Sequence, residues 1–341
     1  MTNFIKVPKL EADKARNALM EHNLYLKGIK TQNDKEFVYF PVIKKGFKTK
    51  ELKKYKVVTK KSKEYSTTKS FRDILVDDLH IKDYIASYDT VGGIAILKMT
   101  PEMKKKEKEL THLFLQNNPT IKTLVKKASE HHGKYRLEDV KYLAGKKTLK
   151  TQVKESGCIF NIELGKMFFS PRLSFERERL AQKVKDGSTI GVFFAGVGPF
   201  SIVIAKKNPN CKIYSIELNR EAHKCAKENL AQNKIKNVRV VCADVAKYAQ
   251  KIKDLCDYII MPLPKTSDLF LESAYTAIKK KPEGQITLYK FVPKASLYKD
   301  LINELKLFAK KKKKKLKVIF KREVRDYNPK IVQIVIDFKF V

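Results

Sequence analysis

The sequence predicts an α/β protein whose C-terminal half is a Rossmann-like, doubly wound sheet with an antiparallel edge pair, preceded by two smaller α/β or α+β domains. The first supporting observation is TIGVFFAGVGPFS at residues 189–201, where a strand-like run enters a glycine turn and then a helix-like segment. The second is the series of apolar runs that follows it, at residues 212–217, 238–243, 257–261 and 285–290. The third is the pair of runs 316–320 and 331–338, which favours an antiparallel pair at the sheet edge.

The glycine turn itself is typical of a nucleotide-binding corner. Gly196 and Gly198 lack the Cβ atoms that would keep a ligand away from the backbone, and Pro199 suits a first helical turn. Ser201 stands where the dinucleotide pattern has a third glycine, so the pattern alone also fits an ordinary tight strand-to-helix connection.

Polar residues follow the next strands at the positions where a ligand would lie. Glu217 ends the second run and Asp244 follows the third, while the fourth leads into the proline turn at residues 262–264. Because the carboxyl ends of parallel strands gather at one rim, the sequence predicts that these residues line one crevice with the glycine turn. The alternative is that Glu217 and Asp244 only cap the helices that follow them.

The charge balance indicates a polyanionic partner. The chain has 341 residues with 73 Lys and Arg against 37 Asp and Glu, a net charge of +36. Genome bias or adaptation to heat also enriches lysine, but heat adaptation enriches glutamate with it, and here the acidic residues do not balance the lysines. Nucleic acid is therefore the first partner to expect.

The cysteines, the histidines and the N-terminal residues indicate the redox state, metal binding and location that we expect for the protein. The five cysteines show no CxxC spacing and the six histidines complete no metal pattern, so we expect reduced thiols and no metal site. The first residues are charged too early for a signal peptide, and no apolar run reaches about 18 residues. A cytoplasmic protein without a membrane segment is expected.

Composition and patterning divide the chain into three predicted domains, 1–65, 70–171 and 172–341. In the first we expect a small basic α/β unit followed by a lysine-dense stretch, 44–66, that is either a flexible connection or an RNA-facing surface. In the second, residues 101–117 predict one amphipathic helix. The six consecutive lysines at 310–315 are as consistent with phosphate contact as with a solvated face.

Several longer motifs resemble the archaeal and eukaryotic tRNA (guanine-37-N1)-methyltransferase family. The likeness covers nearly the whole chain, which makes it far more specific than the glycine turn. It favours the archaeal subgroup that is also linked to methylation of a wyosine precursor. The motifs are VPKLEADKAR at 7–16, YDTVGGIAILKM at 88–99, FSPRLSFERER at 169–179, FAGVGPFSI at 194–202, IELNREA at 216–222 and PLPKTSDLFLESA at 262–274.

This resemblance implies an enzyme with S-adenosylmethionine as its cofactor and a class I methyltransferase domain at 172–341. It also implies tRNA as the partner, gripped at its outer corner by the mobile first domain and at its anticodon loop by the rest, with the second domain supporting RNA binding and catalysis. No DNA partner is expected, and the protein is expected to be a monomer.

Methylation of guanine N1 needs a base for the N1 proton and a fixed donor for the charge that develops on O6. The family supplies a glutamate and an arginine, and by position these are Glu176 and Arg136. Without the resemblance, the favoured interpretation of Glu176 is an exposed helix residue bonded to Arg172 or Arg179.

The resemblance also assigns binding residues. Glu217 is expected to bind the ribose, Asp244 the adenine amino group, and the turn 195–198 the methionine end. The cofactor set is Arg177, Ala195, Gly196, Val197, Gly198, Glu217, Leu218, Asp244, Val245 and Pro262, and the substrate set is Arg172, Pro262, Leu263 and Pro264.

Two departures from the family pattern affect these assignments. Val192 replaces the aspartate that commonly positions the methionine ammonium, so donor binding is expected to be weaker or to use another acid. Pro262 replaces the asparagine of the family's NLP motif, so the base pocket loses a side-chain amide and could admit the larger tricyclic wyosine precursor for C7-methylation.

Three alternatives stay open at this point. Altered contacts to the methionine tail are compatible with the aminocarboxypropyl transferase of the wyosine pathway, which uses the same donor. The turn plus Glu217 also fits a nicotinamide-dependent oxidoreductase, although the missing third glycine and the basic charge argue against it. The two departures also allow a catalytically inactive RNA-binding protein.

Overall fold

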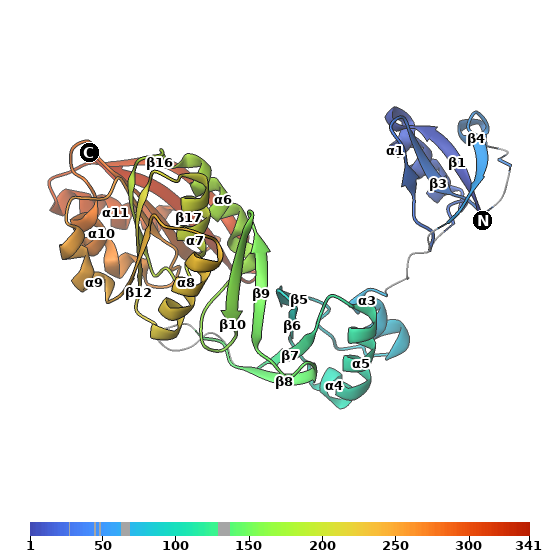
Figure 1. Cartoon of the computed structure of the whole chain (residues 1–341), viewed down its shortest axis with the longest axis horizontal. Coiled ribbons are helices and arrows are strands. Elements are labelled where there is room, and N and C mark those ends of the chain that lie inside the picture. The colour runs from blue at the N-terminus through green and yellow to red at the C-terminus, as the bar shows by residue number, and fades with distance from the viewer. Residues whose placement is uncertain (27, 44–45, 48, 63–68, 129–136) are drawn as a thin grey trace. The chain divides into compact units, whose positions relative to one another are not determined.

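The computed structural model describes residues 1–341 apart from 27, 44–45, 48, 63–68 and 129–136 (Figure 1). The chain divides into two compact units, Met1–Asp78 and Leu79–Val341. Each unit has its own sheets and its own buried core.

The first unit is a four-stranded sheet in the order β2-β3-β1-β4, with helix α1 packed on a core that contains Ile5, Leu19 and Phe40. Of the two expectations for residues 44–66, a flexible connection does not hold for residues 50–53 and 56–60, which form α2 and β4, and an RNA-facing surface stays a prediction. Val57 and Val58 supply the apolar residues that let β4 pair with β1. The elements are β1 Thr2–Pro8, α1 Ala12–Glu21, β2 Gln32–Asn33, β3 Phe37–Pro41, α2 Lys50–Lys53, β4 Lys56–Lys60 and α3 Phe71–Asp73.

The second unit opens with a four-stranded sheet in the order β5-β6-β7-β8. The single helix expected at 101–117 is two helices, because Lys106 leaves the helical conformation at φ −109° and ψ 24°. The elements are β5 Tyr88–Val91, β6 Ile94–Leu97, α4 Pro101–Lys105, α5 Glu107–Asn117, β7 Thr123–Lys127 and β8 Val140–Gly145.

A hairpin of β9, Lys150–Glu155, and β10, Cys158–Glu163, follows and packs against helix α8, Arg220–Gln232. Two buried asparagines, Asn229 in that helix and Asn233 at its C-cap, bind the hairpin backbone: the amide of Ile159 donates to Asn233 at 2.8 Å and that of Asn161 to Asn229 at 2.7 Å. The hairpin is thereby tied to the third predicted domain, and the boundary at residue 171 stays a prediction.

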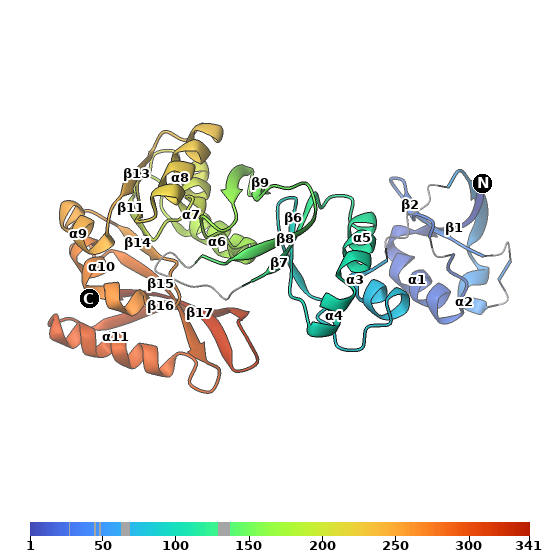
Figure 2. The same cartoon turned by 90° about the horizontal axis from the view of Figure 1, so that it is seen from below.

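The C-terminal part is a seven-stranded sheet in the order β13-β12-β11-β14-β15-β17-β16 (Figure 2). Strands β13 to β15 run parallel, and β17 and β16 are antiparallel at the edge, so the predicted fold class and edge pair are confirmed. The remaining elements are α6 Ser174–Lys183, β11 Thr189–Phe193, α7 Pro199–Lys207, β12 Lys212–Glu217, β13 Val238–Cys242, α9 Val245–Tyr248, β14 Tyr258–Met261, α10 Leu271–Ala277, β15 Gln285–Pro293, α11 Lys299–Lys311, β16 Leu316–Asp326 and β17 Ile331–Phe340.

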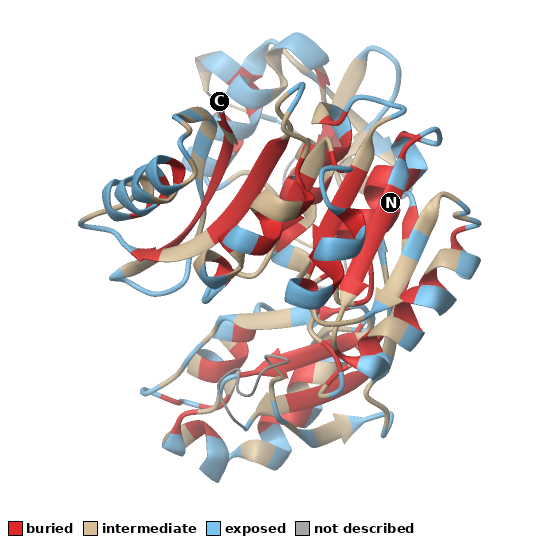
Figure 3. Ribbon diagram, turned by 90° about the vertical axis from the view of Figure 1, so that its left-hand side faces the viewer, coloured by how far each residue is buried: buried red, intermediate tan, exposed pale blue. Residues whose placement is uncertain are grey.

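Helices cover both faces of this sheet. One core contains residues of α6, α7 and α8, and the other contains residues of α9, α10 and α11. Consecutive strand residues alternate between the two cores, as Val192 and Phe193 do. Because both faces are covered, the central strands are mostly apolar, and Figure 3 shows them as the buried centre of this part.

Candidate active site

A cavity of about 500 Å³ opens at the carboxyl ends of β11, β12, β13 and β14. The strand order reverses between β11 and β14, and ligands of open α/β sheets bind at such a switch point. We call this cavity the crevice. Its lining residues are Phe168, Phe194, Gly196, Glu217, Leu218, Asn219, Ala222, Asp244, Val245, Pro262, Leu263, Lys265, Thr266, Leu269 and Phe270.

The glycine turn forms one wall of the crevice. Gly196 has φ +57° and Gly198 has φ +84°, values in the left-handed region that favour glycine. Gly198 is the N-cap of α7, and Pro199 occupies the first turn of that helix. The sequence requires glycine here for the backbone conformation, and the same residues leave the backbone open to a ligand.

Glu217 links this turn to the start of α8. Its carboxylate accepts the amide of Gly196 at 2.7 Å through Oε2 and the amide of Asn219 at 2.7 Å through Oε1. Burial raises the pKa of Glu217, and the backbone donors oppose that rise. A carboxylate so fixed at the end of β12 is in the position that binds ribose hydroxyls in this architecture.

Glu217 and Asp244 differ in whether they cap a helix. The cap of α8 is Asn219, whose Oδ1 accepts the amide of Glu221 at 3.0 Å, so Glu217 does not cap that helix. Asp244 does cap α9, accepting the amide of Ala246 at 2.8 Å, and it also lines the crevice. Sequence reasoning missed Asn219 as a lining residue, although an asparagine before a helix is a recognised capping signal.

Aromatic residues form a second wall that sequence reasoning also missed. The rings of Phe194 and Phe270 meet edge to face with centroids 4.7 Å apart, and Phe168 completes the wall. Phe194 holds φ +56°, a left-handed conformation that costs a side chain about 1–3 kcal/mol. No periodic pattern in a sequence signals a positive φ, so only the structure shows that Phe194 lines the crevice.

Other predicted cofactor residues lie outside the crevice. Ala195, Val197 and Gly198 belong to the turn without lining it, and Val192 is fully buried in the sheet. Pro264, which was predicted as a substrate residue, also lies outside, with its carbonyl accepting the amide of Phe291 at 2.8 Å.

Arg177, the remaining predicted cofactor residue, is 1% exposed and lies in the core. Its guanidinium binds both oxygens of Glu155, at 2.5 and 2.6 Å, and the carbonyl of Ser170 at 3.1 Å. Arg177 therefore holds the β9–β10 hairpin to α6 in this structure.

Arg172 lines a second cavity of about 420 Å³, which we call the Arg172 cavity. Its Nε donates to Asp89 at 2.9 Å. Phe168 lines both the crevice and this cavity, so the two share an aromatic wall. Of the predicted substrate residues, Pro262 and Leu263 line the crevice with the cofactor residues, and Arg172 lines the neighbouring cavity.

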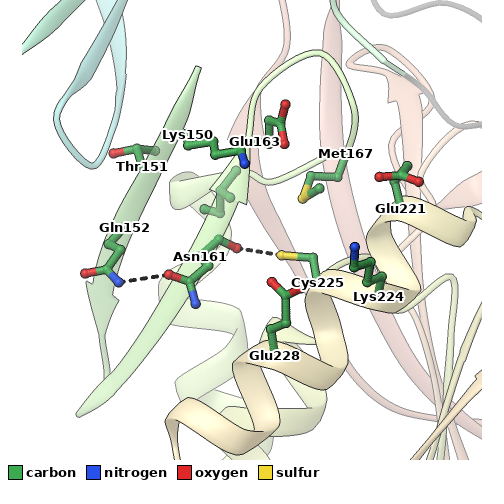
Figure 4. Close-up of a pocket in the computed structure, with 11 residues that line it drawn as sticks. Lys150, Thr151, Gln152, Asn161, Glu163, Met167, Glu221, Lys224, Cys225 and Glu228 are labelled. Atoms are coloured by element: carbon green, nitrogen blue, oxygen red, sulfur yellow. Dashed lines mark hydrogen bonds between the residues drawn. The ribbon is translucent and has the colours of Figure 1, made fainter. Parts of the chain in front are cut away.

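A third cavity, of about 500 Å³, lies between the β9–β10 hairpin and α8 (Figure 4). Within it Gln152 donates to Asn161, and the Cys225 thiol donates to the carbonyl of Asn161. Basic Lys150 and Lys224 share its lining with acidic side chains. None of the predicted site residues lines this cavity.

No cluster of three or more potential metal ligands occurs among the described residues. None of the helices in the described part of the chain combines the length and the apolar character needed to span a bilayer.

Comparison with known proteins identifies the family. Models of the tRNA methyltransferase 5 N-terminal domain, the TYW2 N-terminal domain and the TRM5/TYW2 methyltransferase domain match residues 5–50, 70–148 and 151–319. The chain is 31% identical to the tRNA (guanine(37)-N(1))-methyltransferase Trm5b of Pyrococcus abyssi, over 99% of both chains. The protein belongs to the TRM5/TYW2 methyltransferase family. This membership sets aside a nicotinamide-dependent oxidoreductase.

Two further relatives are named for modifications of 4-demethylwyosine at position 37. The tRNA 4-demethylwyosine(37)-methyltransferase Taw21 of Saccharolobus solfataricus is 36% identical over 59% of this chain and 76% of its own. The tRNA(Phe) (4-demethylwyosine(37)-C(7)) aminocarboxypropyltransferase of Methanocaldococcus jannaschii is 29% identical over 74% and 97%.

Solved structures of TRM5/TYW2 proteins share the architecture. Trm5b from Pyrococcus abyssi superposes with a TM-score of 0.73 at 31% identity, covering 100% of this chain and 99% of that one. A complex of aTrm5 with tRNALeu gives 0.72 at 29% identity and 99% of both chains. TYW2 of M. jannaschii in complex with AdoMet gives 0.57 at 27% identity, covering 74% and 99%.

The glutamate that the TRM5/TYW2 resemblance assigns to catalysis lies in a buried charge network. Glu176 is 0% exposed, so it is not the exposed helix residue that the sequence alone favoured. Its Oε2 accepts from Arg179 Nε at 3.0 Å and from the Tyr289 hydroxyl at 2.7 Å. Its Oε1 accepts no hydrogen bond from any described residue, although Arg322 Nε lies 3.3 Å away.

A second buried acid completes the network. Asp337 accepts from Arg179 at 2.7 Å, from Lys183 at 2.5 Å and from Thr287 at 2.6 Å. Burial, with the charge of Glu176, raises the pKa of Tyr289 well above its ordinary value, so its hydroxyl remains a proton donor. The network ties α6 to β15, β16 and β17.

The structure does not test the role of either residue assigned to catalysis. Glu176 lines neither the crevice nor the Arg172 cavity. Arg136 falls outside the described residues. The roles of both therefore stay predictions.

Proposed function

We propose that this protein transfers a methyl group from S-adenosylmethionine to N1 of guanosine 37 in the tRNA anticodon loop. The observation that carries the proposal is a carboxylate-lined crevice at the switch point of a chain that aligns end to end with Trm5b. The M. jannaschii relative with AdoMet supports the donor, and the aTrm5 complex supports tRNA as the partner.

The crevice fits the donor in size and chemistry. Its volume of about 500 Å³ lies in the ordinary range for a small-molecule site. When bound there, S-adenosylmethionine supplies an electrophilic methyl group on a positively charged sulfur. Glu217 would hold the ribose hydroxyls, Asp244 the adenine amino group, and the backbone of residues 195–198 the methionine end. Val192 offers no carboxylate to the ammonium, which predicts weaker donor binding.

Glu176 is our candidate for the base that accepts the N1 proton. Support comes from its fixed carboxylate, in which Oε2 is hydrogen-bonded and Oε1 accepts no hydrogen bond from any described side chain. Because the residue is buried, the role requires the acceptor guanine to replace Arg322 beside Oε1. Arg136 is the candidate for stabilising charge on O6, a role assigned by resemblance alone.

RNA binding is proposed to use phosphate contacts from the basic first unit at the outer corner of tRNA and from the rim of the crevice at the anticodon loop. The net charge of +36 supports this arrangement, and it predicts that affinity falls steeply with salt. The lysine run at 310–315 is a further candidate for phosphate contact. A single copy of the chain is proposed to bind one tRNA.

The deciding experiment incubates the purified protein with unmodified tRNA transcript and S-adenosylmethionine carrying a labelled methyl group. The expected result is 1-methylguanosine at position 37, and no transfer to a transcript with adenosine at that position. Methylation at another position, or donor binding without any transfer, would overturn the proposal; the latter would leave an inactive RNA-binding protein.

C7-methylation of the tricyclic wyosine precursor is a second candidate. Pro262 lines the crevice without the amide of the family's asparagine, and the Taw21 relative is named for methylation of 4-demethylwyosine. The test is the same assay on tRNA that carries the precursor. Label from the methyl carbon in the tricyclic base supports this activity, label from the carboxyl carbon indicates aminocarboxypropyl transfer instead, and no label in that base rejects both.

A further inference from the structure

The Arg172 cavity contains a basic group that neither the sequence nor the family resemblance assigned. Arg325, near the end of β16, lines it together with Arg172. Arg325 Nε donates to the amide oxygen of Gln333 at 2.8 Å, and Gln333 is buried. The guanidinium is therefore anchored by a neutral group, which fixes its position without neutralising its charge.

The charges around this cavity do not balance. Among the residues that the structure describes, four basic and two acidic side chains line it, which leaves an excess of two positive charges. Both acidic groups already have basic partners: Asp89 binds Arg172, and Glu138 binds Lys127 at 2.8 Å. The excess therefore falls on Arg325 and on Lys98.

Arg325 shares the cavity with a second guanidinium group, that of Arg172, whose charge Asp89 balances only in part. Burial, and after it the charge of Arg172, lowers the pKa of Arg325, whereas Asp89 acts in the opposite direction. A bound anion would relieve this repulsion. Guanidinium groups bind phosphate oxygens through paired N–H donors, so phosphate is the ligand chemistry that fits.

The surroundings indicate what carries the phosphate. Tyr327 follows β16, also lines the cavity, and packs its ring on Phe291 with centroids 4.6 Å apart, leaving the tyrosine 40% exposed. An exposed, braced aromatic ring beside a cationic site is the arrangement that binds single-stranded nucleic acid. Phe168 lines both this cavity and the crevice, so a phosphate bound here would lie close to the reacting nucleotide.

We infer that Arg325, together with Arg172, binds one backbone phosphate of the tRNA anticodon loop next to the nucleotide that is methylated, with Tyr327 stacking on a neighbouring base. This inference rests on the proposed function. It adds a binding residue from the C-terminal edge strands, which the sequence predicted only as structural elements.

The first test compares Arg325→Gln with Lys317→Gln, which removes one positive charge from the exposed beginning of the same strand. Arg325→Gln is expected to weaken binding of unmodified tRNA about ten- to hundredfold, the effect of one charge-assisted hydrogen-bonded contact. It should also reduce the slope of log affinity against log salt by about 0.7–0.9. Lys317→Gln should change affinity little, and donor affinity should be unchanged in both. Equal effects of the two variants on tRNA affinity would overturn the assignment.

The second test identifies the phosphate. Anticodon stem-loop RNAs each carry a neutral methylphosphonate at one linkage around the target nucleotide. The unaltered protein is expected to bind one of these RNAs more weakly than the RNA without a methylphosphonate. Arg325→Gln should bind that RNA no more weakly than it binds the RNA without a methylphosphonate, because the two changes remove the same contact. A free phosphate ion as the true ligand would appear as competition by inorganic phosphate without sensitivity at any linkage, and that outcome rejects the RNA assignment.

The outcomes separate the two levels of inference. If the unaltered protein fails to methylate position 37, the proposed function fails whatever Arg325 does. If it methylates position 37 and Arg325→Gln keeps full affinity and the same linkage sensitivity, only the phosphate assignment fails. Thermal unfolding of both variants checks that the fold is retained.

Discussion

Replacing Arg177 separates a structural role from the cofactor role that the resemblance implied. The residue and its partner Glu155 have side chains that are 1% and 9% exposed, so solvent screens their attraction little. Breaking a buried pair leaves an uncompensated charge and typically costs about 3–5 kcal/mol. We predict that Arg177→Met lowers the free energy of unfolding by this amount and leaves donor affinity unchanged.

Urea unfolding of the full chain measures the loss of stability. Because the chain has no tryptophan, unfolding is followed by far-ultraviolet circular dichroism instead of tryptophan fluorescence. At about 2–4 °C per kcal/mol for a unit of this size, the melting temperature should fall by roughly 6–20 °C. The double variant Arg177→Met with Glu155→Leu should recover most of the loss, since both charges are then removed.

Donor binding, measured by calorimetry on protein that is still folded, supplies the refuting outcome. If Arg177→Met weakens S-adenosylmethionine binding tenfold or more while stability changes by less than about 1 kcal/mol, the structural reasoning is wrong. Arg177→Lys is the matched control, because it keeps the charge and loses the paired geometry. The free energy of unfolding of Arg177→Lys should lie between those of the unaltered protein and Arg177→Met.

Other predictions concern the crevice and the charge network. Because burial raises the pKa of Glu217, its carboxylate becomes protonated at a higher pH than that of an ordinary glutamate. Donor affinity should therefore fall as the pH drops through that raised pKa. Calorimetry over a range of pH tests this, and a donor affinity that does not depend on pH contradicts it. Glu176→Gln should reduce turnover while tRNA affinity, from filter binding, stays nearly intact; equal loss of both indicates a structural role. Asn219→Ala should destabilise the fold by about 1 kcal/mol through loss of the α8 cap, measured by urea unfolding, and no loss would contradict the cap. In the first unit, Tyr39 and two amides lower the pKa of Asp34 to about 2, so its stabilising contribution should disappear as pH falls from about 4 to about 2; Tyr39→Phe should move that pKa, measured by NMR, back toward 3.8.

Local rules explain what the sequence determined. Apolar runs covered on both faces, a glycine turn that needs positive φ, and acids at strand ends define a parallel sheet and its crevice, because parallel strands place their carboxyl ends together. The lining by Gly196, Glu217, Asp244 and Pro262 follows from this rule. The motifs along the chain likewise identified its family, which the full-length comparison confirmed.

Tertiary structure decided which charges are buried and with which partners. Arg177 meets Glu155 across 22 residues of chain, and Arg179 meets Asp337 across 158. No periodicity encodes such pairings, since each depends on how a hairpin or an edge strand packs against α6. The free energy of a charge depends on its burial and neighbours, and only the folded chain fixes both. The sequence therefore placed Arg325 only in a strand, and the cofactor role that the resemblance assigned to Arg177 stays a prediction.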